Sequence, residues 1–355
     1  MCRPQRQEHT INCATTNCIS IEEKVLERIL LIRLSSLGDI VLTTPAIRAV
    51  RSHYPNAYIA MLVAQQSADV LLENPHLNEI IQFNRLAKDK DTGEMIRILR
   101  ILRQRQFALT LDFQRKFRTE LLMYLSGASE RVGKGRLCTI RVPHSEEKHA
   151  TERYFDVLHA AGIPAEDRQL EIHLSDAERT DASDAFEDAG IKEQQLKVGL
   201  FPGAGWKLRE WMPERFASIG DKLVQNYNAQ VIVFGGPNEI ELVANVCDLM
   251  QEQVYHFAGT LGIRELAAYI EKCNLFLTND TGPMHIASAV GTPTVALFGP
   301  GNHIRFQPLG EMHTTIRHDV PCNPCKQFTD KCKDNICMKK ITVDEVWTTI
   351  CRILG

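Results

Sequence analysis

The chain has 355 residues, 44% hydrophobic and 24% charged, a composition typical of a soluble globular protein. Its length predicts two domains of ordinary size. No stretch reaches the roughly 18 consecutive apolar residues of a membrane-spanning helix, which excludes an ordinary membrane-spanning protein. The net charge of −3 is unevenly distributed: residues 1–160 carry 23 Lys/Arg against 18 Asp/Glu, and residues 161–355 carry 18 against 26. The basic first half indicates an acidic partner.

Residues 1–27 lack the apolar core of a signal peptide, so we expect no export. We interpret this segment as a poorly ordered extension, with a helix beginning near Ser20. Eleven cysteines in a chain without an export signal predict a mostly reduced, cytoplasmic protein.

Short apolar runs alternate with amphipathic segments along the rest of the chain. This alternation predicts βαβ units, hence an α/β fold with parallel sheets covered by helices on both faces. No internal sequence repeat is visible. The expected strands are 29–34, 58–63, 80–83 and 108–112, then 197–201, 230–234, 254–257, 275–278 and 294–298. The expected helices are 44–53, 92–105, 151–161, 213–227, 239–251 and 263–272.

Positive charge concentrates in residues 97–118 and 131–141. Such clusters favour a phosphorylated substrate, a nucleic acid or an anionic membrane surface. For the arginines within 97–105, a solvated helix face is an equally good interpretation. The acidic, polar stretch 166–195, which has no strong strand pattern, predicts the domain boundary. Two doubly wound domains would bind ligands between them, at the carboxyl ends of their strands.

The first strand-exit loop reads "SSLGD" and ends in Asp39, which is followed by a helical pattern. An aspartate at a helix start caps the helix or, in a transferase, takes a proton. Thr44 followed by Pro45 predicts a second helix start, with Thr44 as the N-cap. If Thr44 caps the helix, Asp39 is available for catalysis.

The second loop follows the strand 197–201 and contains Gly203, Ala204 and Gly205, then Lys207 and Arg209. Small residues let backbone N–H groups approach a phosphate, and the cations balance its charge. The alternative is a plain strand-to-helix loop with solvated cations.

The third loop reads "NDTGPMH" and leads into a helix expected near Met284. Thr281 and Gly282 place hydroxyl and amide donors at a helix N-terminus, which favours an anion. His285 can donate to a phosphate oxygen; an isolated histidine would instead be a satisfied surface imidazole. No G-x-G-x-x-G follows a strand and no H-E-x-x-H occurs, which argues against a dinucleotide dehydrogenase and a zinc protease.

Taken together in this order, the loops resemble those of glycosyltransferase family 9, the bacterial ADP-heptose:lipopolysaccharide heptosyltransferases. The resemblance extends from about residue 28 to residue 346. It is carried by "SSLGDIVLTTPAIRA", "LDFQRKFRTELL", "HATERYFDVL", "GAGWKLREWMPERF", "FGGPNEIEL" and "NDTGPMHIASAVGTPTVALFGP".

The resemblance implies two Rossmann-like domains facing across a cleft, the GT-B type, with inversion at the anomeric carbon and no catalytic metal. It divides the chain into four parts. These are the extension 1–27, an acceptor domain at 28–168, a nucleotide-sugar domain at 169–340 and a C-terminal helix at 341–355.

The resemblance also implies roles for individual residues. Asp39 is the base, and Lys116 and Arg118 contact the acceptor. Arg209 matches the cation that contacts the diphosphate, although the family commonly has lysine there and this sequence inserts Met212 before the proline. Glu239 holds the ribose and Leu261 lies in the adenine region. The implied donor-binding set is Gly38, Gly203, Ala204, Gly205, Arg209, Glu239, Leu261, Asp280, Thr281, Gly282 and His285.

The implied partners are an ADP-sugar donor, a phosphorylated lipid or lipopolysaccharide-core acceptor and an anionic membrane surface, with no nucleic acid and no required cofactor. The expected location is the cytoplasmic face of the inner membrane. Two alternatives remain open: a transferase of the same fold with another nucleotide sugar or a protein acceptor, and a non-catalytic sugar-nucleotide-binding protein.

Four cysteines lie close together near the C-terminus: Cys322, Cys325, Cys332 and Cys337, spaced C-x2-C-x6-C-x4-C. Four thiolates in sixteen residues can hold a structural zinc or iron ion. Reduced thiols or adventitious disulfides are the alternative. A catalytic role is not expected, because these residues follow both nucleotide-type loops.

Overall fold

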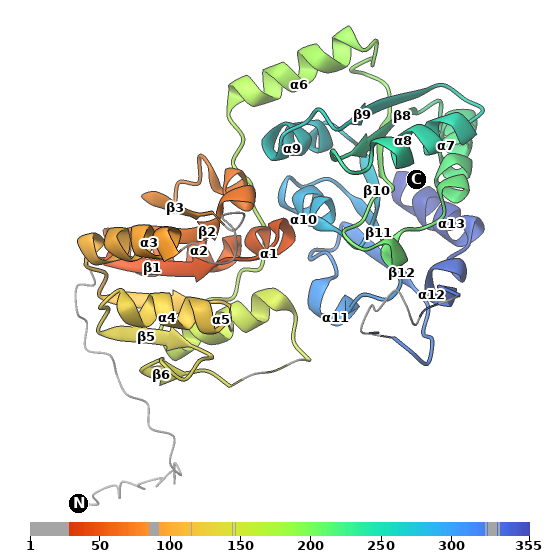
Figure 1. Cartoon of the computed structure of the whole chain (residues 1–355). Coiled ribbons are helices and arrows are strands. Elements are labelled where there is room, and N and C mark those ends of the chain that lie inside the picture. The colour runs from red at the N-terminus through yellow and green to blue at the C-terminus, as the bar shows by residue number, and fades with distance from the viewer. Residues whose placement is uncertain are drawn as a thin grey trace, which may run out of the picture.

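The protein is described from a computed structural model that covers residues 28–84 and 92–355, apart from 115, 144, 146, 324, 326–331 and 333. The expectations for residues 1–27 lie outside the described residues. Figure 1 shows two α/β lobes side by side, each built on one sheet. In the described ranges each sheet has six strands, and every strand pair is parallel. The expected α/β fold is therefore confirmed.

The first lobe contains a sheet in the order β3-β2-β1-β4-β5-β6. Its strands are β1 (Arg28–Arg33), β2 (Tyr58–Ala64), β3 (Glu79–Phe83), β4 (Leu109–Asp112), β5 (Glu130–Gly133) and β6 (Ile140–Arg141). Its helices are α1 (Leu37–Val41), α2 (Thr44–His53), α3 (Thr92–Arg105), α4 (Phe117–Leu125) and α5 (Ala150–Ala160), with short 3-10 turns η1 (Gln65–Ser67) and η2 (Asp69–Leu71).

The second lobe contains a sheet in the order β12-β11-β10-β7-β8-β9. Its strands are β7 (Lys197–Phe201), β8 (Gln230–Gly235), β9 (Val254–Ala258), β10 (Leu275–Asn279), β11 (Thr294–Phe298) and β12 (His313–Arg317). Its helices are α6 (Asp176–Asp188), α7 (Pro213–Tyr227), α8 (Ile240–Leu249), α9 (Ile263–Glu271), α10 (Gly282–Ala289), α11 (His303–Phe306), α12 (Ile336–Lys339) and α13 (Val343–Leu354), with the 3-10 turn η3 (Lys207–Arg209).

Both sheets have the same strand order when counted from their own first strand. In each, the first and fourth strands are neighbours, β1 beside β4 and β7 beside β10, and the chain reverses its direction of progress between them. Ligands of doubly wound sheets bind outside the carboxyl ends of such neighbours. The loops after β1, β4, β7 and β10 are therefore the candidates for a site, and the three loops singled out above follow β1, β7 and β10.

Burial explains why the long strands were predictable. All five residues of β7, β10 and β11 are buried, as expected for strands with helices on both faces. The strands β5, β6 and β12 were not expected; β6 has two residues and β12 is only half-buried. Short or half-exposed strands lack the continuous apolar run on which the prediction depends.

The expected boundary at 166–195 contains the helix α6, which the sequence analysis did not predict. A capping box starts it: the Ser175 hydroxyl accepts from the Glu178 amide, and the Glu178 carboxylate accepts from the Ser175 amide. Its mean hydropathy is low and only Ala182 and Phe186 are buried on it. Because α6 has so few apolar positions, its sequence does not show a recognisable helical pattern of hydrophobic residues.

The two lobes pack directly on one another where α1 meets α10 (Figure 1). A side chain at Gly38 would place its Cβ 2.6 Å from Cδ2 of His285, and one at Gly282 would lie 3.2 Å from Leu37. Glycine at both positions lets the helices approach this closely. One continuous group of buried apolar residues includes members of both lobes.

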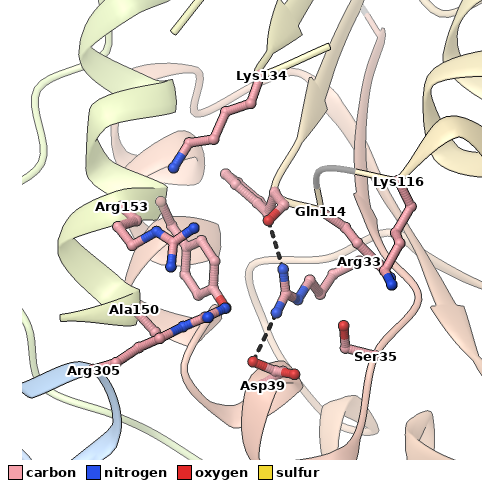
Figure 2. Close-up of a pocket in the computed structure, with 11 residues that line it drawn as sticks. Arg33, Ser35, Asp39, Gln114, Lys116, Lys134, Ala150, Arg153 and Arg305 are labelled. Carbon is pink, nitrogen blue, oxygen red and sulfur yellow. Dashed lines mark hydrogen bonds and ion pairs between the residues drawn. The ribbon is translucent and has the colours of Figure 1, made fainter. Parts of the chain in front are cut away.

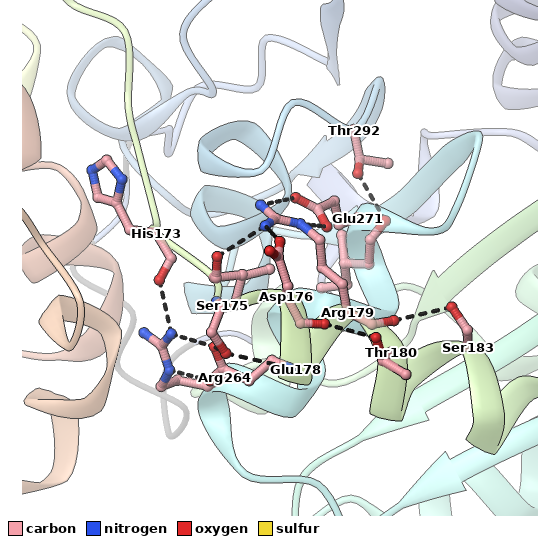
Figure 3. A network of polar contacts seen from close by, with 12 residues as sticks. His173, Ser175, Asp176, Glu178, Arg179, Thr180, Ser183, Arg264, Glu271 and Thr292 are labelled. Atoms are coloured by element: carbon pink, nitrogen blue, oxygen red, sulfur yellow. Dashed lines mark hydrogen bonds and ion pairs between the residues drawn. The ribbon is translucent and has the colours of Figure 1, made fainter.

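The segment that joins the lobes is held by arginines from both sides. Arg48 of α2 donates to Glu171, Asp167 and the carbonyl of Gln169. Figure 3 shows the contribution of Arg264 of α9, which donates to Glu178 and to the carbonyl of His173. In the described ranges, no helix is both long and apolar enough to cross a membrane.

Candidate active site

Asp39 lies in the first turn of α1, at the end of β1. Its Oδ1 is 2.7 Å from Nη2 of Arg33, the last residue of β1, and its Oδ2 accepts from the Ser36 hydroxyl at 3.2 Å. Asp39 is not the N-cap of either helix. Ser36 is the N-cap of α1 and Thr43 that of α2, so the predicted Thr44 cap is wrong by one residue. The Thr44 hydroxyl instead donates to the Val41 carbonyl.

The environment keeps Asp39 ionised at neutral pH. Burial raises the pKa of Asp39, but the charge and hydrogen bond of Arg33, followed by the charge of Arg305, outweigh it and lower the pKa below its ordinary value. Arg33 is itself only 6% exposed. Arg33 also donates to the Phe113 carbonyl at 2.6 Å, which ties the ion pair to the loop after β4.

A cavity of about 330 Å³ opens beside this ion pair (Figure 2). Five of its lining residues are cationic and one is anionic. The cations are Arg33, Lys116, Lys134, Arg153 and Arg305, the anion is Asp39, and the remaining lining residues are Ser35, Phe113, Gln114, Ala150 and Tyr154. Such a charge balance favours an anionic ligand that reaches Asp39.

The cavity draws on both lobes. Arg305 comes from α11 of the second lobe, and Figure 2 shows it reaching across toward Arg153 and Asp39. Burial, followed by the neighbouring charge of Arg153, lowers the pKa of Lys134 to about 8. Tyr154 lies beneath the Arg33 guanidinium, 5.2 Å from ring centroid to Cζ, and burial raises its pKa to about 12.

The two residues expected to contact the acceptor lie in different places. Lys116 lines the cavity. Arg118 is not among the lining residues: it is exposed, with its guanidinium 5.8 Å from the centroid of the Phe83 ring. Lys116 is the N-cap of α4 and Arg118 lies two residues later, so the two side chains leave the chain in different directions. Lys116 therefore lines the same cavity as Asp39, and Arg118 does not.

The loop that carries Lys116 is organised by a buried carboxyl. Asp112, at the end of β4, accepts from the Gln114 amide at 2.8 Å and from the Thr119 hydroxyl at 2.9 Å. Burial raises its pKa to about 7. The Gln114 side chain then accepts from the Leu34 amide at 2.6 Å, which joins the loops after β1 and β4.

In the second lobe, Glu239 lies against the glycine loop after β7. Its Oε2 accepts from the Gly236 amide at 2.6 Å, and a Cβ at Gly203 would lie 2.6 Å from its Cγ. Ala204 and Gly205 continue the loop, half-buried and exposed respectively. Leu261 lies half-buried between β9 and α9. These residues follow β7, β8 and β9, so they share the carboxyl edge of the second sheet.

Arg209 and Asp280 form an ion pair between the loops after β7 and β10, with Nη1 to Oδ2 at 3.2 Å. Burial raises the pKa of Asp280 to about 6, against the opposing charge of Arg209. Gly301 is required beside it, because a Cβ there would overlap Asp280 Oδ2. Asn279 joins the same loops: it donates to the Pro202 carbonyl and accepts from the Trp211 amide.

The helix α10 begins at Gly282, two residues before the expected start at Met284, and Thr281 is its N-cap. The Thr281 hydroxyl makes no cap bond, which leaves it available to a ligand at this N-terminus. His285 is buried under Gly38, and burial, with the charge of His149, lowers its pKa to about 3. The imidazole is therefore neutral, and any hydrogen bond that it donates comes from the neutral ring.

Cys322 and Cys325 lie near enough to Cys337 that, after burial, their charges help raise the pKa of its thiol. No three of the sulfur atoms of Cys322, Cys325, Cys332 and Cys337 lie within 4.8 Å of one another. Cys337 is 3% exposed, and burial raises the pKa of its thiol. A structural metal at these cysteines stays a prediction.

Arg33, Lys134, Arg153, Tyr154 and Arg305 line the cavity but were not named as site residues by the sequence analysis. Lys134 lies in the basic cluster 131–141, and Arg153 and Tyr154 lie in the quoted segment "HATERYFDVL". Those signals could have indicated three of them. Arg33 reads as part of a strand, and Arg305 comes from the other lobe, so neither had a local signal.

The comparisons with known proteins agree with this geometry. Residues 95–335, more than half of the chain, match glycosyltransferase family 9 (heptosyltransferase). Lipooligosaccharide heptosyltransferase 2 of Campylobacter jejuni is 26% identical over 317 residues, which cover 87% of this chain and 94% of that protein.

Two solved structures share the fold. The family 9 glycosyl transferase of Veillonella parvula superposes with a TM-score of 0.86 at 24% identity, covering 93% of this chain and 97% of that one. The ADP-heptose lps heptosyltransferase II of Escherichia coli gives a TM-score of 0.76 at 21% identity, covering 92% and 98%. The chain thus belongs to glycosyltransferase family 9.

Proposed function

We propose that this enzyme transfers heptose from ADP-heptose to a phosphorylated inner-core acceptor of lipopolysaccharide, with Asp39 as the general base. The observation that carries the proposal is the ionised Asp39, fixed by Arg33 at the wall of a cavity lined by five cations. The names of the relatives support the donor and acceptor classes: the E. coli protein is an ADP-heptose lps heptosyltransferase, and the C. jejuni protein is a lipooligosaccharide heptosyltransferase.

The cavity is the proposed acceptor site. Phosphate or carboxylate groups of the acceptor would lie among Lys116, Lys134 and Arg305, which would bring a hydroxyl to Asp39. A base with a lowered pKa is charged in the resting enzyme and takes the proton as the new C–O bond makes the hydroxyl acidic. Arg33 would keep the carboxylate oriented during this step.

The loops after β7 and β10 are the proposed donor site. Glu239 would hold the ribose, and Leu261 would contact the adenine. Arg209 and the N-terminus of α10 at Thr281 and Gly282 would stabilise the charge that develops on the leaving diphosphate. We propose that these groups serve without a catalytic metal, and that attack from the first lobe inverts the anomeric carbon.

We also propose that the first lobe touches the inner face of the cytoplasmic membrane, from which a lipid-linked acceptor is reached. Three large apolar side chains are exposed on α3 and α4: Ile96 at 55%, Phe117 at 73% and Tyr124 at 51%. Basic residues accompany them, including Arg100, which lies on α3, and Arg118. Apolar and cationic side chains on one pair of helices suit an anionic bilayer surface.

The test is a panel of nucleotide sugars with and without a phosphorylated core acceptor, scored for binding and for release of the nucleoside diphosphate. We expect acceptor-dependent ADP release with ADP-heptose. ADP-heptose binding without turnover on any acceptor would favour a non-catalytic sugar-nucleotide-binding protein. Preference for another nucleotide sugar would keep the reaction class and change the donor.

A further inference from the structure

Three side chains away from the active site converge on one point between the first lobe and the linker. They are His76, in the turn after η2, and Glu171 and His173, in the segment before α6. Nε2 of His76 lies 3.4 Å from Glu171 Oε1, and Nε2 of His173 lies 3.5 Å from the same oxygen. Within the described part of the chain, no other set of three or more histidine, cysteine or acidic side chains gathers its ligand atoms this closely.

The spacing is too long for a hydrogen-bonded cluster. A charge-assisted hydrogen bond from nitrogen to a carboxylate spans roughly 2.7–2.9 Å. Glu171 Oε1 and His173 Nε2 are both buried, and neither has a hydrogen-bond partner among the described residues. Two imidazole nitrogens thus face one carboxylate oxygen without bonding to it. Buried polar atoms normally have a partner, so these atoms indicate a bound water molecule or ion between them.

The same spacing suits ligands of one metal ion. Zinc binds imidazole nitrogen and carboxylate oxygen at roughly 2.0–2.2 Å in a tetrahedral arrangement, in which two ligand atoms are about 3.3–3.5 Å apart. The two measured separations, 3.4 and 3.5 Å, fall in that range. Two histidines and one carboxylate are also a common ligand set for zinc and related divalent ions.

The ligands are held in place by contacts that need no metal. Arg48 donates to the other oxygen of Glu171 at 2.6 Å, and the Glu171 amide donates to the Thr44 hydroxyl. The His173 carbonyl accepts from Arg264 at 2.8 Å, and Figure 3 shows the His173 imidazole turned away from that arginine. Supporting contacts of this kind fix the orientation of metal ligands.

The charges around the cluster have opposing effects. Arg48 and Arg51 repel a cation, whereas Glu171 and Asp167, which pairs with Arg48, offset part of that charge. Burial, together with His173, Arg48 and Arg51, lowers the pKa of His76 against the raising effect of Glu171.

We propose that His76, Glu171 and His173 bind a divalent transition-metal ion of the zinc type, with water in the remaining position. The ion would join the linker to the first lobe. The site lies apart from the cavity that contains Asp39, because none of its ligands lines that cavity. Its role is therefore structural, at the segment about which the lobes would move.

Equilibrium dialysis of the full chain against zinc tests the proposal, followed by metal analysis of the protein. The wild type is compared with His173→Gln and Glu171→Gln, and with His256→Ala, a matched control on an exposed histidine of β9. We expect each ligand variant to bind one equivalent less than the wild type and the control to bind the same amount. Melting curves without metal show that each variant is folded.

Zinc bound by the C-terminal cysteines would add to the total, so cobalt(II) is used as a second probe. Thiolate-bound cobalt gives an intense near-ultraviolet charge-transfer band that nitrogen and oxygen ligands do not give. We expect His173→Gln to lose the part of the visible cobalt absorption that comes from nitrogen and oxygen ligands, while any thiolate charge-transfer band stays unchanged. Zinc should also raise the melting temperature of the wild type more than that of the variants. Equal stoichiometry and equal spectra in folded variants would overturn the proposal.

Discussion

The first lobe brings four cations and a single carboxylate to one cavity, to which the second lobe adds Arg305. Around its own sheet the second lobe brings glycines, a helix N-terminus and an arginine neutralised by a buried aspartate. Both lobes have the same strand order, so the backbone does not explain the difference. The side chains that follow equivalent strands do. The same strand order carries a proposed base and a cation-lined cavity in one lobe, and a proposed nucleotide site in the other.

The largest expected effect is at the base. In Asp39→Asn, kcat should fall by roughly 10² to 10⁴, because the amide cannot take the acceptor proton. Donor affinity should be retained, since the second lobe is unchanged. The melting temperature should decrease, because buried Arg33 loses its charged partner at a cost of about 1.5–3 kcal/mol.

We would measure kcat by steady-state kinetics, donor affinity by calorimetry with ADP-sugar, and the melting temperature by thermal melts. Ser36→Ala is the control, because it removes only the hydroxyl that contacts Asp39. Near-normal kcat in Asp39→Asn would remove Asp39 as the base.

The second lobe should respond in donor binding alone. Arg209→Ala should weaken ADP-sugar binding by roughly 10- to 100-fold, the effect of losing a charged hydrogen bond. Acceptor KM should not change. Calorimetry measures the donor affinity, and Lys340→Ala, on an exposed residue outside the three loops, is the control. A purely acceptor-side effect of Arg209→Ala would reverse the assignment of the two lobes.

The first lobe should respond in acceptor binding. Lys134→Ala should raise the acceptor KM about tenfold and leave ADP-sugar affinity unchanged, because Lys134 lines the cavity beside Asp39 and lies outside the loops after β7 and β10. Initial rates at varied acceptor and saturating donor test this. A change in donor affinity with unchanged acceptor KM would mean that the cavity is not the acceptor site.

The acceptor side should also be sensitive to alkaline pH. The pKa of Lys134 is lowered to about 8, so its ammonium group loses its proton as the pH rises through that value. An anionic acceptor should therefore bind several-fold more weakly at pH 9 than at pH 7. Lys134→Arg keeps its charge over this range and should flatten the profile of acceptor KM against pH. An equally steep profile in Lys134→Arg would assign the effect to another group.

The smallest effect is expected at Arg118. Because its side chain is exposed against Phe83 and does not line the cavity, Arg118→Ala should change the acceptor KM by less than about twofold on a water-soluble acceptor. Kinetics on the truncated soluble acceptor measure this directly. A tenfold rise there would return Arg118 to the acceptor site that the family resemblance implied.

The strands that could be predicted from the sequence are the ones that are buried in the fold. The continuous apolar runs of β1, β7, β10 and β11 revealed those strands, whereas the two-residue β6 and the half-exposed β12 gave no such pattern. The repeated strand order was invisible in the sequence, because a topology is preserved by packing and not by residue identity.

The site was predictable where its chemistry is local. Asp39, Arg209 and Asp280 stand in short, recognisable loops. The cationic cavity was not, because Arg33 and Arg305 are 272 positions apart in the sequence and meet only after the lobes have packed. The difference between Lys116 and Arg118 depends on helix geometry, which no spacing of charges reveals.

The contact of Gly38 with His285 also constrains how this protein can be recombined with its relatives. The interface has no room for a β-carbon at position 38, so a chimaera that pairs this first lobe with a foreign second lobe inherits a surface shaped for a particular partner. Residues 35–39 and 280–285 lie in different lobes but fit each other closely, so they should be exchanged together when parts of two relatives are combined. A chimaera designed to test the proposed acceptor cavity should therefore take both segments from the same parent protein.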